Sequence, residues 1–297
     1  MRRSVLVTGA TSGVGREAAL KLAKAGFEVF ATARDGEKAE KLRAQAAERD
    51  VTLRTVLLDV ADADSCRDAC AQVAEATEGG PWALVNNAGI PLPGAVEDVD
   101  DAAARHLLEV NVVGAARMAR LVLPGMRKRG DGRIVNVSSL AGRVTAPATG
   151  WYCAGKSALG ALNDALRMEA GPGGVQVVVV EAGAHASAIQ IRAADALAAL
   201  AARGQTVFGD VYRVAEAGLR ESATRLPGSE VVASAVCQAL FAARPRHRYV
   251  VGRQARLGPF ADALTPVRVK DHVKRAAMGA EAHPLVAYAA RRWCTPW

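Results

Sequence analysis

The chain alternates short apolar runs with longer segments in which apolar residues recur every three or four positions. The first run covers residues 4–8, an amphipathic segment follows to about residue 25, and residues 28–33 form the next run. Runs of this length predict strands buried on both faces, and the longer segments predict helices. Alternation of the two indicates an α/β fold, in which a doubly wound parallel sheet carries helices on both faces.

The same alternation continues beyond residue 33. Further strands are predicted at 51–58, 82–85, 133–137 and 175–180. Further helices are predicted at about 36–48, 64–78, 100–126, 152–170 and 229–243. Because parallel strands all end at the same edge of a sheet, ligands are expected at their carboxyl ends.

A glycine-rich loop joins the first predicted strand to the first predicted helix. Glycine lets a backbone approach a pyrophosphate closely, and a helix start offers free N–H groups and the positive end of the helix dipole. The loop lies between strand and helix, as this mechanism requires, and therefore predicts a dinucleotide site. Its candidate binding residues are Gly9, Thr11, Ser12, Gly13, Val14 and Gly15.

Arg34 follows the second predicted strand, where a dinucleotide fold selects its cofactor. An acidic residue there would bind the ribose 2′-hydroxyl, whereas arginine suits a 2′-phosphate. Arg34 therefore favours NADP(H) over NAD(H). The alternative is an exposed arginine in an ordinary loop, with Asp35 beside it partly offsetting its charge.

Tyr152 and Lys156 are four residues apart on a predicted helix, so they share one face, with the ammonium beneath the phenol. A nearby cation stabilises a phenolate and lowers the pKa of a tyrosine towards the working pH. Ser139 lies where a predicted strand ends, and its hydroxyl could hydrogen-bond a carbonyl oxygen. Together the three predict an acid–base site. Alone, the tyrosine–lysine pair would indicate only a half-buried surface contact.

These motifs together resemble the short-chain dehydrogenase/reductase family. The resemblance covers about residues 4–187 and rests on Thr8-Gly9-x-x-x-Gly13-x-Gly15, Asn86-Asn87-Ala88-Gly89, Asn111, Ser139 and Tyr152-x-x-x-Lys156. It implies a Rossmann-type sheet of about seven strands in one domain, residues 1–279. Within that domain, residues 188–228 would form a helical substrate lid. Residues 280–297 would be a tail of unknown role.

The resemblance also implies roles for the motif residues. Tyr152 would be the general acid in carbonyl reduction and the base in alcohol oxidation. Lys156 would lower the pKa of Tyr152 and hold the nicotinamide ribose, and Ser139 would orient the substrate oxygen. Asn111 would break the regularity of its helix and hold a relay water, unless it is simply a polar residue on an apolar helix. The residues expected to contact adenine or line the cofactor cleft are Asp59, Val60, Asn87, Ala88 and Gly89.

The chain departs from the family pattern after the strand at 175–180. Family members commonly have Pro-Gly there, followed by an aliphatic residue and a threonine that touch the nicotinamide carboxamide. This chain has Glu181-Ala182-Gly183-Ala184-His185-Ala186-Ser187. Gly183 and Ser187, whose hydroxyl can replace that of threonine, are candidate cofactor contacts. The missing proline predicts a less constrained loop, and His185 would bind substrate, titrate with pH or point into solvent.

The segment expected to form the lid, residues 188–228, has an amphipathic pattern. By the resemblance, its apolar stripe would face a lipophilic substrate; the alternative is a helical pair packed on the body or on a neighbouring subunit. The segment 244–252 resembles the last strand of retinol and 17β-hydroxysteroid dehydrogenases. The apolar stripe of the expected lid consists of Ile189, Ile191, Leu197, Leu200, Val207, Phe208, Val211, Tyr212 and Leu219.

The distribution of charge along the chain limits the kinds of macromolecular partner that are expected. Residues 244–297 carry eleven Lys and Arg against three Asp and Glu, an excess equal to the net charge of +8 for the whole chain. A basic C-terminal segment could attract a membrane surface. Because no aromatic residues are interleaved with the basic ones, a solvated surface or a subunit contact is favoured, and no nucleic-acid partner is expected. No apolar run could span a bilayer and no signal segment follows Met1, so a cytoplasmic location is expected.

The cysteines fit reduced thiols, because they are odd in number and widely spread. Cys66 and Cys70 share a helical face, but no histidine or second cysteine pair accompanies them, so no metal site is predicted. The five are Cys66, Cys70, Cys153, Cys237 and Cys294.

The sequence therefore predicts an NADP(H)-dependent ketoreductase or alcohol dehydrogenase that acts on the carbonyl or secondary alcohol of a lipophilic small molecule, with a bulky apolar ketone or alcohol as the expected substrate class. Two alternatives stay open: an NAD-dependent alcohol or retinol dehydrogenase, and a non-catalytic NADP-binding scaffold or sensor. The resemblance implies a homodimer or homotetramer.

Overall fold

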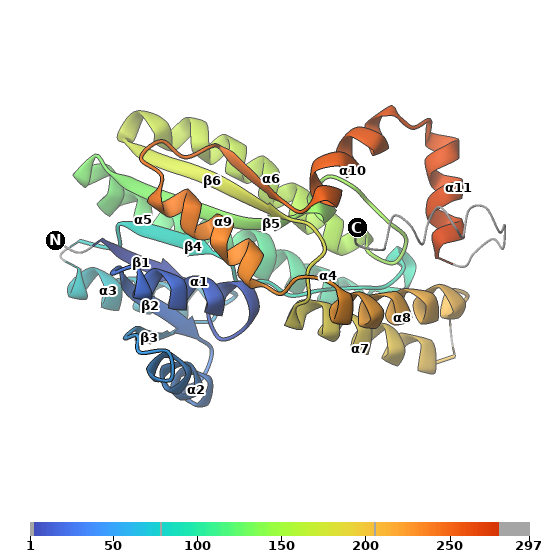
Figure 1. Cartoon of the computed structure of the whole chain (residues 1–297), viewed down its shortest axis with the longest axis horizontal. Coiled ribbons are helices and arrows are strands. Elements are labelled where there is room, and N and C mark those ends of the chain that lie inside the picture. Colours follow the sequence, from blue (N-terminus) through green and yellow to red (C-terminus); the bar gives the residue numbers. More distant parts are fainter. Residues whose placement is uncertain (1–2, 78, 205, 279–297) are drawn as a thin grey trace.

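A central parallel sheet, enclosed by helices, organises the molecule (Figure 1). The computed structural model describes residues 3–77, 79–204 and 206–278. The sheet has seven strands in the order β3-β2-β1-β4-β5-β6-β7, and every neighbouring pair is parallel. The predicted Rossmann-type, doubly wound sheet is therefore confirmed. Its strands are β1 (Ser4–Val7), β2 (Glu28–Ala33), β3 (Arg54–Leu57), β4 (Ala83–Asn86), β5 (Gly132–Ser139), β6 (Val175–Ala182) and β7 (Arg248–Val251).

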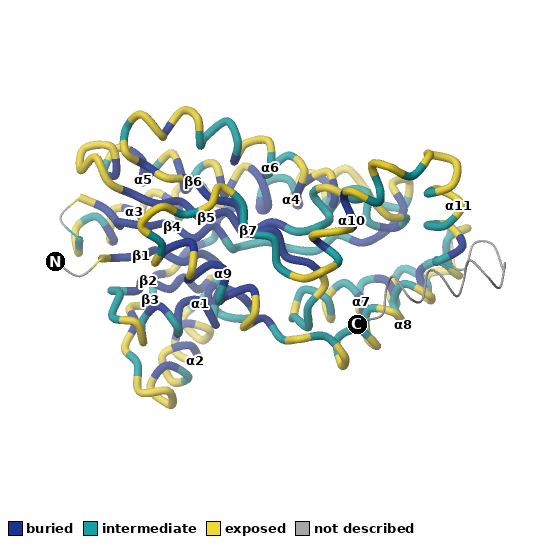
Figure 2. Tube along the Cα trace, turned by 45° about the horizontal axis from the view of Figure 1, so that its top comes forward, coloured by how far each residue is buried: buried dark blue, intermediate teal, exposed yellow. Residues whose placement is uncertain are grey.

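Two hydrophobic cores form because helices cover both faces of the sheet. Val5 and Val7 point into the core under α1, α2 and α9, whereas Leu6 between them points into the core under α3, α5 and α6. All three side chains are fully buried, as the continuous apolar runs predict (Figure 2). The covering helices are α1 (Gly13–Lys24), α2 (Gly36–Ala47), α3 (Ala63–Ala76), α5 (Gly114–Arg129), α6 (Gly150–Ala170) and α9 (Glu230–Phe241).

Several elements differ by one to a few residues from their predicted bounds, and three of the differences have a clear form. β3 begins only at Arg54, because the Val51 amide still donates to the Ala46 carbonyl at the end of α2 (3.0 Å). β7 is reduced to Arg248–Val251. The helix predicted at 100–126 is α4 (Asp101–Leu108), a π-helical turn (Glu109–Val113) and then α5. The predicted tail at 280–297 lies outside the described residues.

Helices α7 (Ala188–Ala202) and α8 (Gly209–Arg225) pack against each other as a hairpin, beyond the carboxyl ends of the strands (Figure 1). Tyr212 of α8 is fully buried and docks this hairpin on the loop after β4. The Tyr212 hydroxyl accepts from the Ala95 amide at 2.8 Å and donates to the Asp98 carboxylate. The Thr206 hydroxyl donates to the same carboxylate at 2.6 Å.

The apolar stripe of the hairpin is used mainly for its own packing. The exceptions are Val207 and Ile191, which are exposed, and Ile189, which is half-buried outside the packed cluster. This arrangement favours the helical pair packed on the body over a stripe free to line a substrate cavity. The cluster comprises Leu197 and Tyr212 with Ala95 and Ala148, and Leu200, Phe208, Val211 and Leu219 pack on it.

Helices α10 (Arg253–Leu264) and α11 (Val267–Ala277) lie beyond the same sheet edge, on the opposite side from the hairpin (Figures 1 and 2). α10 packs close to the end of β5: a methyl group on Gly258 would lie 3.6 Å from the Leu140 side chain. The carboxyl edge is thus flanked by two pairs of helices. Across the described ranges, no helix combines the length and apolar character needed to cross a membrane.

Tyr212→Phe should loosen the hairpin without removing its apolar contacts. The Ala95 amide would lose its acceptor inside the protein and the Asp98 carboxylate one of its donors, so the free energy of local opening should fall by about 1–3 kcal/mol. Native-state hydrogen exchange of α7 and α8 measures this quantity. Tyr249→Phe is the control, because that hydroxyl has only a long contact, 3.4 Å, with the Arg246 amide. Equal protection in both variants would contradict the docking role.

Candidate active site

The predicted acid–base residues converge at the carboxyl edge of the sheet. Ser139 is the last residue of β5, while Tyr152 and Lys156 lie in the first two turns of α6. The Lys156 Nζ is 5.9 Å from the centre of the Tyr152 ring, on the same helix face. These three side chains come from two neighbouring elements that pack on each other.

Lys156 is held in a buried position, with 6% of its surface exposed. Its Nζ donates to the Val137 carbonyl in β5 at 3.1 Å. Burial lowers the pKa of this ammonium to about 8, because the interior disfavours the charged form. Lys156 is therefore ready to exchange a proton near neutral pH.

The pKa of Tyr152 moves in the opposite direction to the prediction. Burial raises it to about 12, and a hydrogen bond with Ser139 only partly opposes that rise. The expected lowering by Lys156 was wrong for this structure, because the ammonium lies under the ring and is itself disfavoured by burial. The phenol is thus neutral at physiological pH and can donate a proton.

Asn111 occupies the middle of the π-helical turn, so the predicted break in helix regularity is present. Its amide oxygen accepts from the Ile90 amide at 2.8 Å, and its amide nitrogen donates to the Ile90 carbonyl at 3.0 Å. A methyl group on Gly89 would lie 3.2 Å from the Asn111 oxygen and 3.8 Å from the Lys156 Nζ. Asn111 thus fixes the loop after β4, with Gly89 of that loop close to the lysine.

A chain of buried asparagines fixes α6 to the sheet. Asn86 of β4 donates to the Asn136 side chain of β5 at 3.0 Å, and Asn136 donates to Asn163 of α6 at the same distance. All three are nearly inaccessible to solvent. Buried amides of this kind tolerate few alternative arrangements, so they set the position of α6 and of Tyr152 on it.

The glycine-rich loop has the shape of a phosphate cradle. Gly9 has a positive φ of 63°, and a methyl group on Gly15 would lie 2.4 Å from the Gly9 carbonyl oxygen, so only glycine fits there. Ser12 is the N-cap of α1 but makes no capping bond with its side chain. The first amides of α1 therefore remain free for an anion. Thr11 and Val14 lie in the same loop and first turn.

Thr8 begins the glycine-rich motif, but the sequence alone assigned it no role in the site. Its hydroxyl accepts from the Asn87 and Ala88 amides, both at 3.0 Å, while the Asn87 side chain donates to the Thr8 and Gly9 carbonyls at 3.0 and 3.1 Å. This exchange links the ends of β1 and β4. A hydroxyl directly before the first glycine was the available signal.

Asp59 and Val60 lie after β3, where their backbone is already fixed. The Asp59 carboxylate accepts from the Ala61 amide at 2.9 Å, and the Val60 carbonyl accepts from Arg117 at 2.7 Å. Arg34 is exposed at the end of β2. The neighbouring Asp35 is committed to the start of α2, where it accepts from the Lys38 amide at 2.9 Å.

The loop after β6 is better anchored than its missing proline suggests. The Gly183 amide donates to the Val251 carbonyl at 2.8 Å, and the Ala186 amide donates to the Pro227 carbonyl at 2.9 Å. His185 turns back towards the chain, with its Nδ1 3.0 Å from the Gly183 carbonyl oxygen. Ser187 is partly buried at the N-cap of α7. Backbone hydrogen bonds to β7 and to Pro227 therefore hold this loop without a proline.

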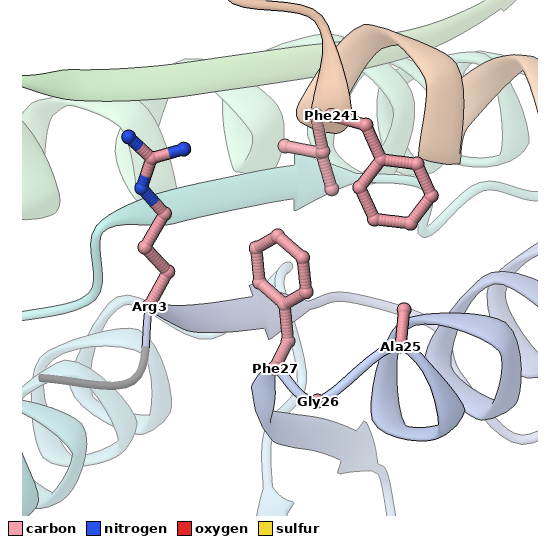
Figure 3. A pocket seen from close by; sticks show the side chains of 6 residues that line it. Arg3, Ala25, Gly26, Phe27 and Phe241 are labelled. Atoms are coloured by element: carbon pink, nitrogen blue, oxygen red, sulfur yellow. The ribbon is translucent and has the colours of Figure 1, made fainter.

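A hollow between the start of the sheet and α9 lies away from these residues. It measures about 300 Å³ and is lined by Arg3, Phe27 and Phe241 among others (Figure 3). Arg3 and Phe27 directly precede β1 and β2, so this hollow is at the amino edge of the sheet, opposite Tyr152. It contains none of the predicted acid–base groups and is not the candidate active site.

No metal centre accompanies the site in the part of the chain that the structure describes, where no three His, Cys, Asp or Glu side chains gather. Cys66 and Cys70 are buried in the core under α3. Cys294 lies outside the described residues.

Comparison with known proteins places the chain in a family. A family model described as short chain dehydrogenase matches residues 3–197. The chain belongs to the short chain dehydrogenase family. Members of this family are oxidoreductases, and the glycine loop, β4, Ser139, Tyr152 and Lys156 all fall within the matched residues.

Three relatives illustrate the similarity. The uncharacterized oxidoreductase YbbO of Escherichia coli (strain K12) is 35% identical over 183 residues, 62% of this chain and just under two thirds, 66%, of that protein. Human 17-beta-hydroxysteroid dehydrogenase type 6 is 32% identical over 283 residues, 91% of this chain and 86% of that protein. The structure of a variant of actinorhodin polyketide ketoreductase with NADPH superposes with a TM-score of 0.72 at 28% identity, covering 86% of this chain and 97% of that chain.

The buried Lys156 should make stability depend on pH. Its pKa is about 8 in the folded chain and near the ordinary 10.5 when unfolded, so the unfolded state binds more protons between these values. The resulting penalty is complete below about pH 8 and shrinks as the pH rises. Between about pH 7.5 and 9.5, the free energy of unfolding should rise by about 2 kcal/mol relative to Lys156→Met, measured in urea. A constant difference would show that Lys156 is not perturbed.

Proposed function

We propose that the protein is an NADP(H)-dependent oxidoreductase that moves a hydride between the nicotinamide and the carbon of an apolar ketone or secondary alcohol. The observation that carries this proposal is the convergence of Ser139, Tyr152 and Lys156 where β5 meets α6. A non-catalytic scaffold would have no need to bury a lysine beneath a tyrosine in this way.

Each side chain has a distinct role in the proposed reaction. NADPH, when bound, supplies the hydride from C4 of its nicotinamide. Tyr152 donates its phenolic proton to the carbonyl oxygen, and its raised pKa keeps that proton in place at neutral pH. Ser139 hydrogen-bonds the same oxygen and orients it. Lys156, with a pKa of about 8, returns a proton to Tyr152 and binds the nicotinamide ribose.

Asn111 is proposed to support this proton transfer by helping to hold a water molecule next to Lys156. A π-helical turn redirects backbone carbonyls that a regular helix would use internally, and such turns often occur at functional sites. Because Gly89 lies close to both the Asn111 amide and the Lys156 ammonium, a water held beside the turn would connect the lysine to solvent.

The chain fits a phosphorylated dinucleotide. The glycines of the first loop leave room for a pyrophosphate, and Arg34 lies at the strand end that meets the adenosine ribose. Asp35 does not compete for the ribose hydroxyls, because it caps α2. Asp59 and Val60 would contact adenine, Asn87 to Gly89 would line the cleft, and Gly183 and Ser187 would meet the carboxamide.

The substrate class is inferred from relatives and from the helices at the edge. The name of human 17-beta-hydroxysteroid dehydrogenase type 6 describes a protein that acts on a bulky apolar alcohol. Here the α7–α8 hairpin, within residues 188–228, would be the lid of the single domain. The resemblance to the family supports a dimer or tetramer built on α6 and on the helix that follows Asn111.

Tyr152→Phe should abolish carbonyl reduction while leaving the cofactor bound. Loss of the proton donor should lower kcat by at least about 100-fold, since general acid catalysis contributes about 10²–10⁴-fold. Initial rates of NADPH and NADH oxidation against a panel of apolar ketones and aldehydes measure this, with NADPH binding by fluorescence as the control for folding. NADPH-dependent turnover that persists in Tyr152→Phe would overturn the assignment. Faster turnover with NADH would favour the NAD-dependent alternative.

A further inference from the structure

Two arginines at the carboxyl edge lack a carboxylate partner. Arg34 follows β2 and Arg192 lies in the second turn of α7, and neither forms a hydrogen bond or ion pair with another described residue. The acidic neighbours are engaged elsewhere: Asp35 pairs with Lys38, and Asp195 of α7 pairs with Arg220 at 2.9 Å. Two uncompensated guanidinium groups therefore face the solvent.

Arg34 emerges beside the glycine-rich loop. The Thr32 hydroxyl, two residues before Arg34, accepts from the Gly9 amide at 3.1 Å. The Thr32 carbonyl accepts from the Ala10 amide at 3.2 Å. These bonds fix the end of β2 against the first half of the loop.

The base of the α7–α8 hairpin lies against the second half of the same loop. A methyl group on Gly13 would lie 3.5 Å from the Ser229 hydroxyl, and that hydroxyl donates to the Ala186 carbonyl at 3.3 Å. α7 starts two residues later, at Ala188, so Arg192 is only about 6 Å along the helix from its start. Arg34 and Arg192 thus rise on two sides of one phosphate cradle.

The two guanidinium groups are close enough to repel each other. Burial lowers the pKa of Arg192, and the positive charge of Arg34 lowers it further. Like charges held together without a counter-ion repel each other, and the attraction of both guanidinium groups to an anion bound between them would outweigh that repulsion.

We propose that Arg192 joins Arg34 in binding the 2′-phosphate of NADP(H), so that the α7–α8 hairpin itself contributes to cofactor selection. This inference rests on the proposed function and deepens it. A phosphate dianion has enough acceptor oxygens for two guanidinium forks, each of which can bind it through two N–H groups. The second fork comes from a helix 158 positions further along the chain, so phosphate binding also holds the hairpin in place.

Dissociation constants for NADPH and NADH test the proposal at one fixed salt concentration. Arg192→Ala should weaken NADPH binding about tenfold, as expected for loss of a charged hydrogen bond, and change NADH binding by less than about twofold. Arg192→Lys keeps the charge and should recover part of the loss. Arg203→Ala is the matched control, because it removes the same charge at the other end of α7, about 16 Å away.

Arg34→Ala distinguishes a failure of the proposed role of Arg192 from a failure of the proposed preference for NADP(H). If it weakens NADPH binding while Arg192→Ala matches Arg203→Ala, the role of Arg192 is overturned and the cofactor preference stands. An equal loss of NADPH and NADH affinity in Arg192→Ala would mean a general structural role, and would also overturn the proposal. If the wild-type chain binds NADH as tightly as NADPH, the preference for NADP(H) fails, and the role of Arg192 fails with it.

Discussion

The candidate site depends on the junction between β1 and β4 at the centre of the sheet. From these two neighbouring strands the chain leaves to opposite faces, towards α1 on one side and towards α4 and α5 on the other. A crevice opens wherever a parallel sheet divides in this way. The Thr8 hydroxyl and the Asn87 amide close the base of the crevice, because each bonds the backbone of the opposite strand. These bonds between the ends of β1 and β4 therefore position the glycine-rich loop on one side of the crevice. They also position the acid–base residues on the other side.

Burial then sets the chemistry of the groups around the crevice. The same low-polarity environment holds the phenol of Tyr152 in its protonated form and makes the ammonium of Lys156 easier to discharge. The two pKa values, nearly equal for the free side chains, therefore move apart, to about 12 for the tyrosine and about 8 for the lysine. Such a pair passes a proton in one direction more readily than either group would alone, which suits a site that must protonate an oxygen.

Local sequence was sufficient wherever a residue's role depends on its own segment. The apolar runs located all the strands of the central sheet up to β6, and the glycine spacing located the cradle, because a buried strand and a tight turn each leave a local pattern. The π-helical turn around Asn111 was expected only through the family resemblance. The role of Thr8 was not predicted, since its partners Asn87 and Ala88, just after β4, are 79 and 80 residues away.

The wrong prediction for the pKa of Tyr152 and the questions that the sequence left open share a physical cause. A helical face places Lys156 near Tyr152, but it does not reveal how far both are buried, and burial decided the pKa of Tyr152. The stripe on the hairpin could pack internally or face a ligand, and only Tyr212 meeting Ala95 and Asp98 distinguishes the two. Likewise, the loop after β6 lost its proline but gained bonds from β7 and from Pro227, which no local pattern predicts.

Tyr212 also bears on how fast such a protein could work. A fully buried ring whose hydroxyl bridges a backbone amide and a carboxylate must lose all of these contacts before the hairpin can swing aside. Such a barrier is crossed slowly compared with the movement of an unattached loop. If reactants enter and leave past α7 and α8, departure of the product rather than hydride transfer would then limit turnover.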